Sequence, residues 1–510
     1  MAARVASAEE TIACERATID SGTPSEELML RAGRRAAGII AARYEKAARN
    51  GVVIYTGPGN NGGDGWVVAA ALSKSGLHSR VIEIAPPRSN EAVSAKEAAL
   101  KMNGVRVENT PGDERLVVDA LLGTGSSGAP RGEIAAAISQ IESLRLTGAT
   151  VVSLDVPSGL DATTGSHEGS VVAESTISFG VAKRGHLIAR DVCGAISIVD
   201  IGLNANDLMS RLPQLVDDEW AHSRIPSIPV DAHKGTRKRL AIVGGSSGMA
   251  GAAILAGQGA LRSGIGLVNI YCAGDSIVSI HAALPAAIVH PWPESPEEIA
   301  SLVQKADSIA IGPGLGNNHE SRKLVERILI AWSGSVVLDA DALNVFTGDF
   351  ASLAKLLNGR DAVLTPHPAE MGRLLGVETE EVLANRFDLG IAPAADSGAA
   401  ILLKGSPTVV FARSGARFVS ASGTAALATG GSGDVLTGII ATLLGQMPEG
   451  EDRAAHAAAC GAFIHGRAAE RCRFVRGITL DDVLHALPVA WNERPVALTD
   501  GTLAELERHA

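Results

Sequence analysis

The sequence predicts an α/β protein of two domains, each built as three layers with a parallel β-sheet between helices. Short apolar runs recur along the chain and alternate with alanine-rich stretches of helix length. Runs that are apolar throughout are typical of parallel strands buried on both faces. At roughly 150 residues per domain, the 510 residues are enough for two large domains with cores of their own.

The predicted strands form two groups separated by a break in the pattern. Those of the first half are Val52–Tyr55, Val81–Ile84, Leu116–Val118, Val151–Leu154 and Ile196–Val199, and those of the second half are Leu240–Val243, Ile309–Ile311, Val336–Leu338, Ala362–Leu364 and Ala400–Leu403. From about Asn204 to Arg239 the alternation gives way to acids, prolines and a basic stretch, as in a linker. We therefore predict one domain over 1–215 and a second over 222–510.

The composition argues against several classes of protein. Acidic residues outnumber basic ones 56 to 45, and aromatic residues make up only 3 %, which disfavours a nucleic-acid surface. The five cysteines show no C-x-x-C pairing, which suits a reducing compartment and offers no zinc site. Glycines interrupt the uncharged run from Leu240 to Leu261, so it is predicted as a strand and a helix rather than a membrane span.

These observations lead us to expect a cytoplasmic protein with neither a membrane nor a nucleic acid as partner. The first residues include Glu9, Glu10 and Glu15 and lack the apolar segment of a signal peptide. Small residues on the alanine-rich helices are compatible with packing between subunits. We therefore expect a homo-oligomer.

A glycine-rich turn follows the first predicted strand. Gly57, Gly59 and Gly62 give the spacing G-x-G-x-x-G at the start of a helix-like stretch, and Glu83 lies near the end of the next apolar run. This arrangement is typical of a Rossmann-like dinucleotide site, where the glycine backbone faces a pyrophosphate and the acid binds a ribose. In a glycine-rich chain, a lone match is equally compatible with simple turn chemistry.

The same turn carries three polar residues that an ordinary dinucleotide site does not need. Asn60 and Asn61 offer amide oxygens, which suit a hard monovalent cation or an orienting hydrogen-bond network. Asp64 fits a phosphate site poorly, because its carboxylate competes with the phosphate for the positive end of the helix. The turn therefore points to a specialised dinucleotide site.

Two further polar loops follow predicted strands. Asp119 precedes a second G-x-G-x-x-G over Gly123–Gly128, and Val151–Leu154 leads directly into Asp155. Because the carboxyl ends of parallel strands share one edge of a sheet, the three loops are expected to form one pocket. Asp119 and Asp155 together are candidates for a general acid/base centre, with turn and helix-cap roles as the alternative.

The loops GPGNNGGDG, VDALLGTG and DVPSGLD, preceded by the helix stretch LMLRAG, resemble the epimerase domain of the NAD(P)H-hydrate repair enzymes. The resemblance covers about residues 11–202, although Leu30 stands where the family pattern has an acid. It implies interconversion of the R and S forms of NADHX and NADPHX, the products of adding water to the nicotinamide ring of NADH or NADPH.

The same resemblance implies roles for individual residues. Asp155 would be catalytic and lie against the nicotinamide ring, while Asn61, Asp119 and Ser158 would coordinate a potassium ion. The residues implied to hold the hydrated dinucleotide are Asn60, Asn61, Gly62, Gly63, Asp64, Gly123, Thr124, Gly125, Ser126, Ser127, Gly128, Ala129 and Asp155.

In the second half, Asp434 is the only charged residue between Phe418 and Pro448, and it directly follows Gly430–Gly433. Backbone N–H groups of such a loop can cradle a phosphoryl oxygen, which would place a base and an anion hole together. The alternative is a helix N-cap, which is common for aspartate. Asn or Ser would also serve as a cap, and a lone buried charge is costly, so we favour a catalytic base.

The stretch ATGGSGDVLTG resembles the ribokinase-like superfamily, in which the equivalent Asp deprotonates a hydroxyl that attacks a nucleotide phosphate. The segments HKG, VGGSSGMAGAAILAG, GPGLG, LDADALN, TPHPAEMGRLLG and LLKGSPT narrow the resemblance to the ADP-dependent dehydratase domain of the same repair system, over about residues 220–490. Lys238 and the pair Thr424-Ala425 depart from the family pattern, both in loops. Together the two resemblances imply a bifunctional enzyme.

The resemblance also implies the residues of the second site. Asp434 would be catalytic, and the S-hydrate would contact Ala253, Gly316, His367 and Asp434. The residues implied to bind ADP are Lys404, Gly405, Ser406, Pro407, Thr408 and Gly433. From the residues alone, the preferred interpretation of His367 between two prolines is a rigid turn. Lys404-Gly405 could then be a surface turn, and Asp339 and Asp341 could be ordinary helix caps.

The expected dehydration proceeds through a phosphate ester. Asp434 would activate the substrate hydroxyl, magnesium and the glycine loop would stabilise the transferring phosphoryl group, and elimination would give NAD(P)H, AMP and phosphate. The alternatives are a vitamin-precursor kinase fused to a nucleotide-binding domain, and a protein that senses NAD(P) metabolites without turnover. A stable phosphorylated product would indicate the first alternative, and binding without epimerisation would indicate the second.

Overall fold

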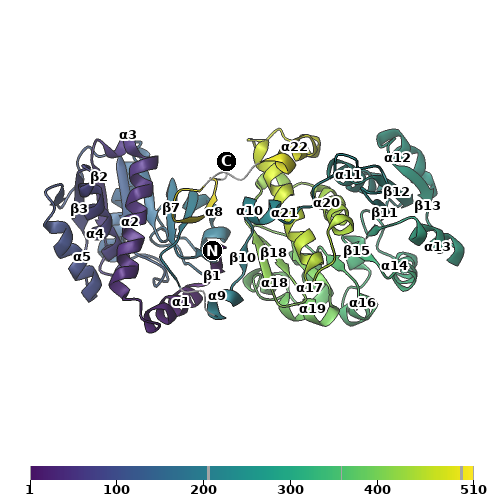
Figure 1. The fold of residues 1–510 in the computed structure, drawn as a ribbon, viewed down its shortest axis with the longest axis horizontal. Coiled ribbons are helices and arrows are strands. Elements are labelled where there is room, and N and C mark those ends of the chain that lie inside the picture. The colour runs from purple at the N-terminus through teal and green to yellow at the C-terminus, as the bar shows by residue number, and fades with distance from the viewer. Residues whose placement is uncertain (1, 204–206, 358, 494–497, 509–510) are drawn as a thin grey trace. The chain divides into compact units, whose positions relative to one another are not determined.

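The computed structural model describes residues 2–203, 207–357, 359–493 and 498–508. The chain divides into two compact units, Met1–Leu215 with Ala497–His509, and Val216–Val496 with Ala510 (Figure 1). Both units contain a mainly parallel sheet with helices around it, so the predicted α/β architecture is confirmed. The change from one unit to the other along the chain falls inside the predicted linker.

The first unit is built on a sheet with the strand order β20-β9-β7-β6-β5-β2-β3-β4, in which every strand except β20 runs parallel to its neighbours. The strands are β2 Val52–Thr56, β3 Ser79–Glu83, β4 Val105–Val107, β5 Leu116–Ala120, β6 Thr150–Leu154, β7 Ser175–Phe179, β9 Ala195–Val199 and β20 Thr502–Leu506. A separate short parallel pair joins β1 Val5–Ala6 to β8 Ala182–Lys183, and β10 spans Gln214–Leu215.

Helices cover both faces of this sheet because its strands are apolar on both sides. In β2, Val52 and Ile54 pack into a core shared with α2 and α4, whereas Val53 and Tyr55 pack into a second core shared with α6. This alternation is the two-residue period of a strand buried on both faces. The helices are α1 Ala8–Asp20, α2 Ser25–Arg43, α3 Glu45–Ala48, α4 Asn60–Lys74, α5 Asn90–Leu100, α6 Gly132–Leu146, α7 Arg184–Ile188, α8 Arg190–Cys193 and α9 Asp207–Arg211.

The last strand of the chain corrects the predicted extent of the second domain. We predicted that the second domain continues to residue 510, but β20 pairs antiparallel with β9 and completes the first unit's sheet (Figure 1, yellow strand). Side chains reinforce this pairing, since Arg43 of α2 contacts Glu505 at 2.5 Å. The sequence does not reveal this return, because pairing between residues so distant in sequence leaves no local pattern.

The second unit has the strand order β19-β18-β17-β16-β15-β14-β11-β12-β13, parallel from β17 to β13 and antiparallel at β18 and β19. The strands are β11 Arg239–Val243, β12 Leu267–Cys272, β13 Ile288–Pro291, β14 Ser308–Ile311, β15 Ser335–Leu338, β16 Ala362–Leu364, β17 Ala400–Leu403, β18 Thr408–Phe411 and β19 Arg417–Ser420. All five strands predicted for this half are present.

The main helices of the second unit are α10 Asp218–His222, α11 Ala250–Arg262, α12 Ile277–Ala283, α13 Pro296–Gln304, α14 His319–Ala331, α15 Asp341–Asn344, α16 Phe350–Leu357, α17 Pro368–Leu375, α18 Thr379–Ala384, α19 Ile391–Ser397, α20 Ser432–Gln446, α21 Arg453–Arg471 and α22 Leu480–Asn492. Glycines bring α11 and α20 into backbone contact. A Cβ atom on Gly438 would lie 1.9 Å from the Ala256 carbonyl oxygen, and one on Gly259 would lie 2.4 Å from that of Val435. This close packing fixes the helix that carries Asp434.

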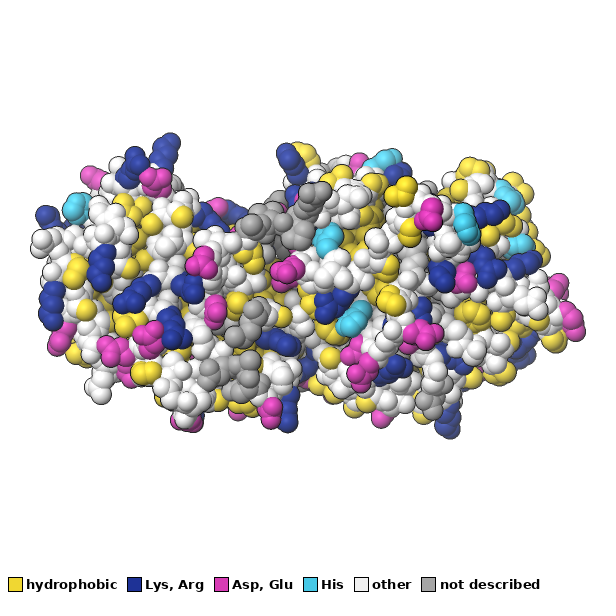
Figure 2. Space-filling view, viewed as in Figure 1, with side chains coloured by type: hydrophobic (Ala, Val, Ile, Leu, Met, Phe, Trp, Pro, Cys, Tyr) yellow, Lys and Arg dark blue, Asp and Glu magenta, His cyan; other side chains and the backbone are white. Residues whose placement is uncertain are grey.

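The uncharged run Leu240–Leu261 folds as β11, a loop and most of α11, as predicted. Among the residues that the structure describes, no helix has the length and apolar character needed to cross a membrane. On the face drawn in Figure 2, acidic and basic side chains are interspersed over the surface.

Candidate active sites

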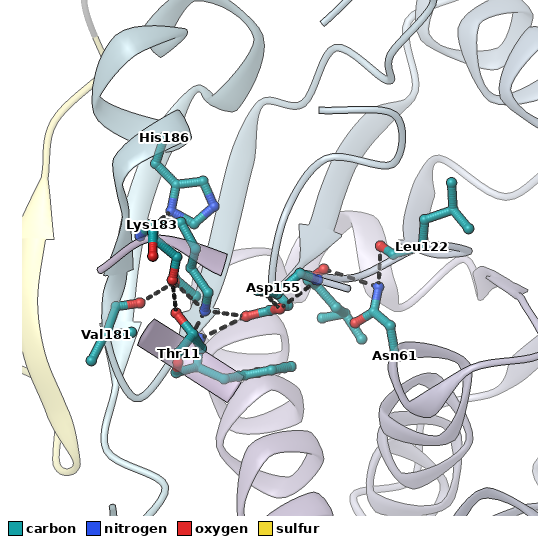
Figure 3. Close-up of polar contacts among 12 residues, drawn as sticks. Thr11, Asn61, Leu122, Asp155, Val181, Lys183 and His186 are labelled. Atoms are coloured by element: carbon teal, nitrogen blue, oxygen red, sulfur yellow. Dashed lines mark hydrogen bonds and ion pairs between the residues drawn. The ribbon is translucent and has the colours of Figure 1, made fainter. Parts of the chain in front are cut away.

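The first candidate site lies where β2, β5 and β6 end next to one another in the first unit's sheet. Asn61, in the first turn of α4, ties the three loops together. Its Nδ2 atom donates hydrogen bonds to the carbonyl oxygens of Leu122 at 2.7 Å and Leu154 at 3.1 Å (Figure 3). The loops that the sequence places at one edge of the sheet therefore do meet.

The glycines of the first loop serve mainly to pack the chain against itself. A Cβ atom on Gly57 would lie 1.9 Å from the Leu121 carbonyl oxygen, and one on Gly62 would lie 2.0 Å from that of Gly57. Of the three motif glycines, only Gly59 faces open space. The G-x-G-x-x-G spacing thus reflects close backbone packing at two positions and leaves one for approach to a ligand.

Asp119 is fully buried and accepts hydrogen bonds from the loops that follow β5 and β6. One carboxylate oxygen accepts from the Ser158 hydroxyl at 2.5 Å and the Leu121 amide at 3.2 Å. The other accepts from the Ser158 amide at 2.8 Å and the Ser153 hydroxyl at 2.9 Å. Burial nevertheless raises the pKa of this carboxyl, with the hydrogen bonds opposing the rise. The structure thus gives Asp119 a clear role in joining β5 to the Asp155 loop.

The three predicted potassium ligands lie around Leu122. The Leu122 amide donates to the Ser158 hydroxyl at 2.9 Å, Ser158 contacts Asp119, and Asn61 contacts the Leu122 carbonyl oxygen. The Oδ1 atom of Asn61 is buried and has no hydrogen-bond partner among the described residues. A buried amide oxygen without a partner among these residues suits an oxygen-ligated cation, and the other two predicted ligands, Asp119 and Ser158, contact each other.

Asp155 follows β6 in a left-handed backbone conformation, with φ at 62°. Its Oδ2 atom accepts from the amide of Thr124 at 3.2 Å and from the Thr124 hydroxyl, and its Oδ1 atom accepts from the Phe179 amide at 3.3 Å. Oδ1 also forms an ion pair with Lys183 (Figure 3). Burial would raise the pKa of Asp155, but the lysine and the hydrogen bonds outweigh it and lower the pKa below its usual range.

Lys183 is a residue of this site that the sequence did not indicate. It lies in β8, its side chain has no exposed surface, and its Nζ atom also donates to the Ser178 hydroxyl at 3.1 Å and the Phe179 carbonyl oxygen at 3.0 Å. Its backbone amide donates to the Nδ1 atom of His186 at 3.2 Å. A usable signal was present, because Lys183 is the first charged residue after the uncharged stretch that follows Glu174.

The charges of Asp155 and Lys183 act on two further acids, Asp64 and Glu15. Burial raises the pKa of Asp64 well above its usual value, and burial followed by the charge of Asp155 raises the pKa of Glu15 to about 7. Asp64 is buried within α4, beyond the first turn of the helix. Glu15 comes from α1, whose part in the site the sequence did not indicate.

A cavity of about 370 Å³ opens beside Asp155. Thr124 joins the two, since it lines the cavity and hydrogen-bonds the carboxylate. The predicted binding residues Thr124, Gly125, Ser126 and Ser127 form one wall. The remaining lining residues are Ala8, Glu9 and Ile12 of α1, together with Asp161, Ala162 and Thr163.

The second candidate site is centred on Asp434 in the first turn of α20. Gly431, with φ at 91°, turns the chain into this helix. Burial and, to a smaller extent, the charge of Asp339 raise the pKa of Asp434 to about 7, against the opposing effect of Lys404. A carboxyl group with this pKa is poised to accept a proton near neutral pH.

Asp339, which the sequence suggests as a helix cap, instead anchors this site. It follows β15, is buried, and accepts from Lys404 Nζ at 2.9 Å, from the Thr437 hydroxyl at 2.7 Å and from the Thr365 hydroxyl at 2.8 Å. The Lys404 ammonium lies 3.7 Å from Glu370 as well. Although burial opposes it, the attraction of these acids raises the pKa of Lys404.

The structure brings the predicted ADP residues Lys404 and Gly433 together, since a Cβ atom on Gly433 would lie 3.3 Å from the lysine Nζ atom. His367 caps α17, where its Nδ1 atom accepts from the amides of Ala369 at 3.2 Å and Glu370 at 3.3 Å. Its other ring nitrogen lies 3.5 Å from Glu370, which connects it to Lys404. His367 is therefore both the rigid turn of the alternative interpretation and a member of the charged cluster.

Of the other two predicted substrate residues, Gly316 lies in the loop after β14 and Ala253 lies in the first turn of α11. The Gly316 amide donates to Asp341 at 2.8 Å, which fixes that loop. The Ala253 side chain is fully buried in α11, 3.2 Å from the position of a Cβ atom on Gly245. A contact from Ala253 to a ligand would therefore use its backbone.

Comparisons with known proteins identify the family of each unit. Residues 240–488 match the family model described as NAD(P)H-hydrate dehydratase, and residues 25–185 match the model described as YjeF-related protein N-terminus. The bifunctional NAD(P)H-hydrate repair enzyme Nnr of Escherichia coli is 36 % identical over 90 % of this chain and 88 % of its own length. Its counterpart from Moorella thermoacetica is 35 % identical, over 91 % and 92 %.

Among solved structures, the ADP/ATP-dependent NAD(P)H-hydrate dehydratase of Bacillus subtilis is similar at a TM-score of 0.48 and 31 % identity, covering 54 % of this chain and 96 % of that one. A ribokinase-like superfamily protein from Enterococcus faecalis is similar at 0.48 and 26 %, covering 54 % and 94 %. The two family models and the full-length sequence matches carry the assignment. The chain belongs to the family of bifunctional NAD(P)H-hydrate repair enzymes.

Proposed function

We propose that the protein repairs hydrated nicotinamide cofactors in two steps. The first unit interconverts the R and S forms of NADHX and NADPHX, and the second converts the S form to NAD(P)H while ADP becomes AMP and phosphate. The names of the full-length relatives support this proposal. The observation that carries it is the pair of separate acidic sites, one around Asp155 and one around Asp434, each on its own sheet.

The dehydration requires a good leaving group, because hydroxide leaves the ring poorly. Asp434 takes the proton of the substrate hydroxyl as the hydroxyl oxygen bonds to the β-phosphorus of ADP, and the bond to the bridging oxygen breaks to release AMP. The ring nitrogen then pushes out the new phosphate ester as phosphate, and loss of a proton restores the double bond. A base with a pKa of about 7 suits the first of these events.

Magnesium and ADP are the ligands that we expect at the Asp434 site. Within the described ranges, no group of three or more histidine, cysteine, aspartate or glutamate side chains could hold a metal ion. Mg²⁺ commonly binds through substrate phosphates and one or two carboxylates while keeping several waters. We therefore expect the ion to arrive with the nucleotide and to neutralise charge on its phosphates.

Potassium is proposed for the first unit. Asn61, Asp119 and Ser158 would hold it, and the orphaned Asn61 oxygen supports this assignment. When bound, the ion would fix the loops after β2, β5 and β6. We also propose a homo-oligomer, because the small residues on the alanine-rich helices are compatible with packing between subunits.

A mixture of R and S hydrate tests the two steps together. With ADP and Mg²⁺ present, the intact chain should convert the whole mixture to NAD(P)H, as followed by the absorbance of the reduced ring. Asp434→Ala should lose this recovery yet still equilibrate the two forms, and Asp155→Asn should convert only the S form. Loss of equilibration in Asp434→Ala would contradict the division of labour, and a stable phosphorylated product would indicate a kinase.

A further inference from the structure

Asp155 is held as an anion by donors from three parts of the chain. Thr124 supplies its amide and hydroxyl to one carboxylate oxygen, while Phe179 and Lys183 supply an amide and an ammonium to the other. Because each donor binds the ionised form more strongly, this carboxylate holds its negative charge and is a weak base. Its left-handed backbone conformation is a further sign that its orientation matters.

Among the residues that the structure describes, Asp155 is the charged group in hydrogen-bond contact with Lys183. Its remaining contacts, to Ser178 and Phe179, are with neutral oxygens, and its side chain is fully enclosed. The pairing of β8 with β1 fixes its backbone. A buried cation is costly unless it is paired, so its charge is committed to Asp155.

The proton for a reaction at this cavity needs another source. Ala8 and Ile12 of α1 line the cavity, and Glu15 follows on the same face of the helix, since positions i, i+4 and i+7 lie in one row. Burial and the Asp155 charge raise the pKa of Glu15 to about 7. Glu15 therefore exchanges protons in the pH range where Asp155 does not.

We propose that Lys183 is a positioning residue that keeps Asp155 as a fixed anion beside the hydrate ring, and that Glu15 exchanges the proton of the ring hydroxyl. This inference rests on the proposed epimerase function of the first unit. Asp155 is then not itself the base. It supplies a fixed negative charge, and Glu15 gives and takes the proton.

With these roles, epimerisation by loss and re-addition of water needs no added reactant. Protonated Glu15 gives its proton to the hydroxyl, the carbon–oxygen bond breaks with its electron pair on oxygen, and water leaves. The lone pair of the ring nitrogen forms a double bond to that carbon, and the Asp155 carboxylate stabilises the positive charge. Water then adds to the opposite face and releases its proton to solvent, and Glu15 takes up a proton from solvent before the next turnover.

The pH profile of epimerisation tests Lys183. As the pH is lowered, the wild-type rate should rise when Glu15 becomes protonated. It should fall only at the lower pH where Asp155 becomes protonated. The other titratable groups facing Asp155 are Asp64 of α4 and His186 of α7, and burial lowers the pKa of His186 to about 3. Lys183→Met should move the acid limb to higher pH and lower kcat about tenfold or more with little change in KM. Lys183→Arg should restore most of the rate.

A control variant removes a different ion pair of the first unit, between β3 and the segment before β5. Arg80 at the start of β3 contacts Glu114 at 2.5 Å, and Arg80→Met should leave the epimerisation profile unchanged. A folded Lys183→Met protein with the wild-type kcat and pH profile would overturn the proposal. If Lys183→Met does not fold, Thr124→Val decides instead, because it removes another donor to Asp155 and should also raise the acid limb.

Glu15→Gln tests the moving proton. Its kcat for epimerisation should fall about 100-fold, as for loss of a general acid, and the remaining rate should lose its alkaline limb near pH 7. Wild-type kcat in Glu15→Gln would overturn this part. A wild-type chain that dehydrates the S form but never equilibrates R and S would instead refute the proposed function.

Discussion

The two central aspartates are tuned in opposite directions by their neighbours. Asp155 and Asp434 are both substantially buried, and burial alone raises the pKa of either. Lys183 and the hydrogen bonds reverse this effect at Asp155, whereas Asp339 shares Lys404 and adds its own negative charge beside Asp434. One carboxylate is therefore a permanent charge and the other a base that titrates near neutral pH.

This difference predicts the pH dependence of the dehydratase. A base works only when it is ionised, so kcat/KM for ADP-dependent formation of NADH from the S form should rise with pH and level off above about 7, the pKa of Asp434. Below that point the rate should fall about tenfold per pH unit. Steady-state rates from pH 5 to 8 measure it. A flat profile across that range would rule out Asp434 as the titrating base.

The Asp339–Lys404 pair predicts a stability effect. Lys404→Met leaves Asp339 buried without its counter-ion, which should cost the second unit about 3 kcal/mol, the low end for buried pairs because Lys404 keeps 21 % of its side chain exposed. Removing both charges with Lys404→Met and Asp339→Asn should recover part of the loss. Thermal unfolding of the four proteins gives the coupling energy, and additive losses would show that the pair is not coupled.

At the scale of elements, Asp434 is positioned by the contact between α11 and α20. The glycines of this contact lie in the interior of both helices, where they lower helix propensity, and they are tolerated because the two backbones touch. The position of the base thus depends on residues one turn or more from it.

Gly438→Ala tests this dependence. The new methyl group would lie 1.9 Å from the Ala256 carbonyl oxygen, so the helices must separate, at a cost of about 1–3 kcal/mol and with a loss of dehydratase rate. Gly251→Ala in α11 is the matched control, because a Cβ atom there meets no atom within 4 Å, and it should be neutral or slightly stabilising. Equal melting temperatures and rates for both variants would disprove the dependence.

At the scale of the whole molecule, the sequence predicted what local patterns encode. The strands, the linker and the meeting of three polar loops follow from apolar runs and chain order, and the structure contains them. Lys183 was missed because β8 becomes part of the site only through its pairing with β1. Asp339 was interpreted as a cap because its partner Lys404 lies 65 positions later in the chain.

The return of the C-terminal strand predicts an asymmetric effect of truncation. A chain ending at Glu493 loses β20 and the ion pair between Arg43 and Glu505, so the first unit should melt at a lower temperature and lose epimerisation. Dehydration of the S form should persist, since β20 belongs to no strand pair of the second unit. Calorimetry with both assays would show this, and an equal loss in both units would contradict it.

This arrangement also sets an order of events during synthesis on the ribosome. The strand that covers the exposed edge of β9 is translated after the whole second unit. The sheet of the first unit therefore keeps the edge of β9 unpaired until the second unit has left the ribosome. A gene fragment that encodes only the first 215 residues would produce a first unit without β20. In the fused chain, the first unit therefore depends on residues encoded at the opposite end of the gene.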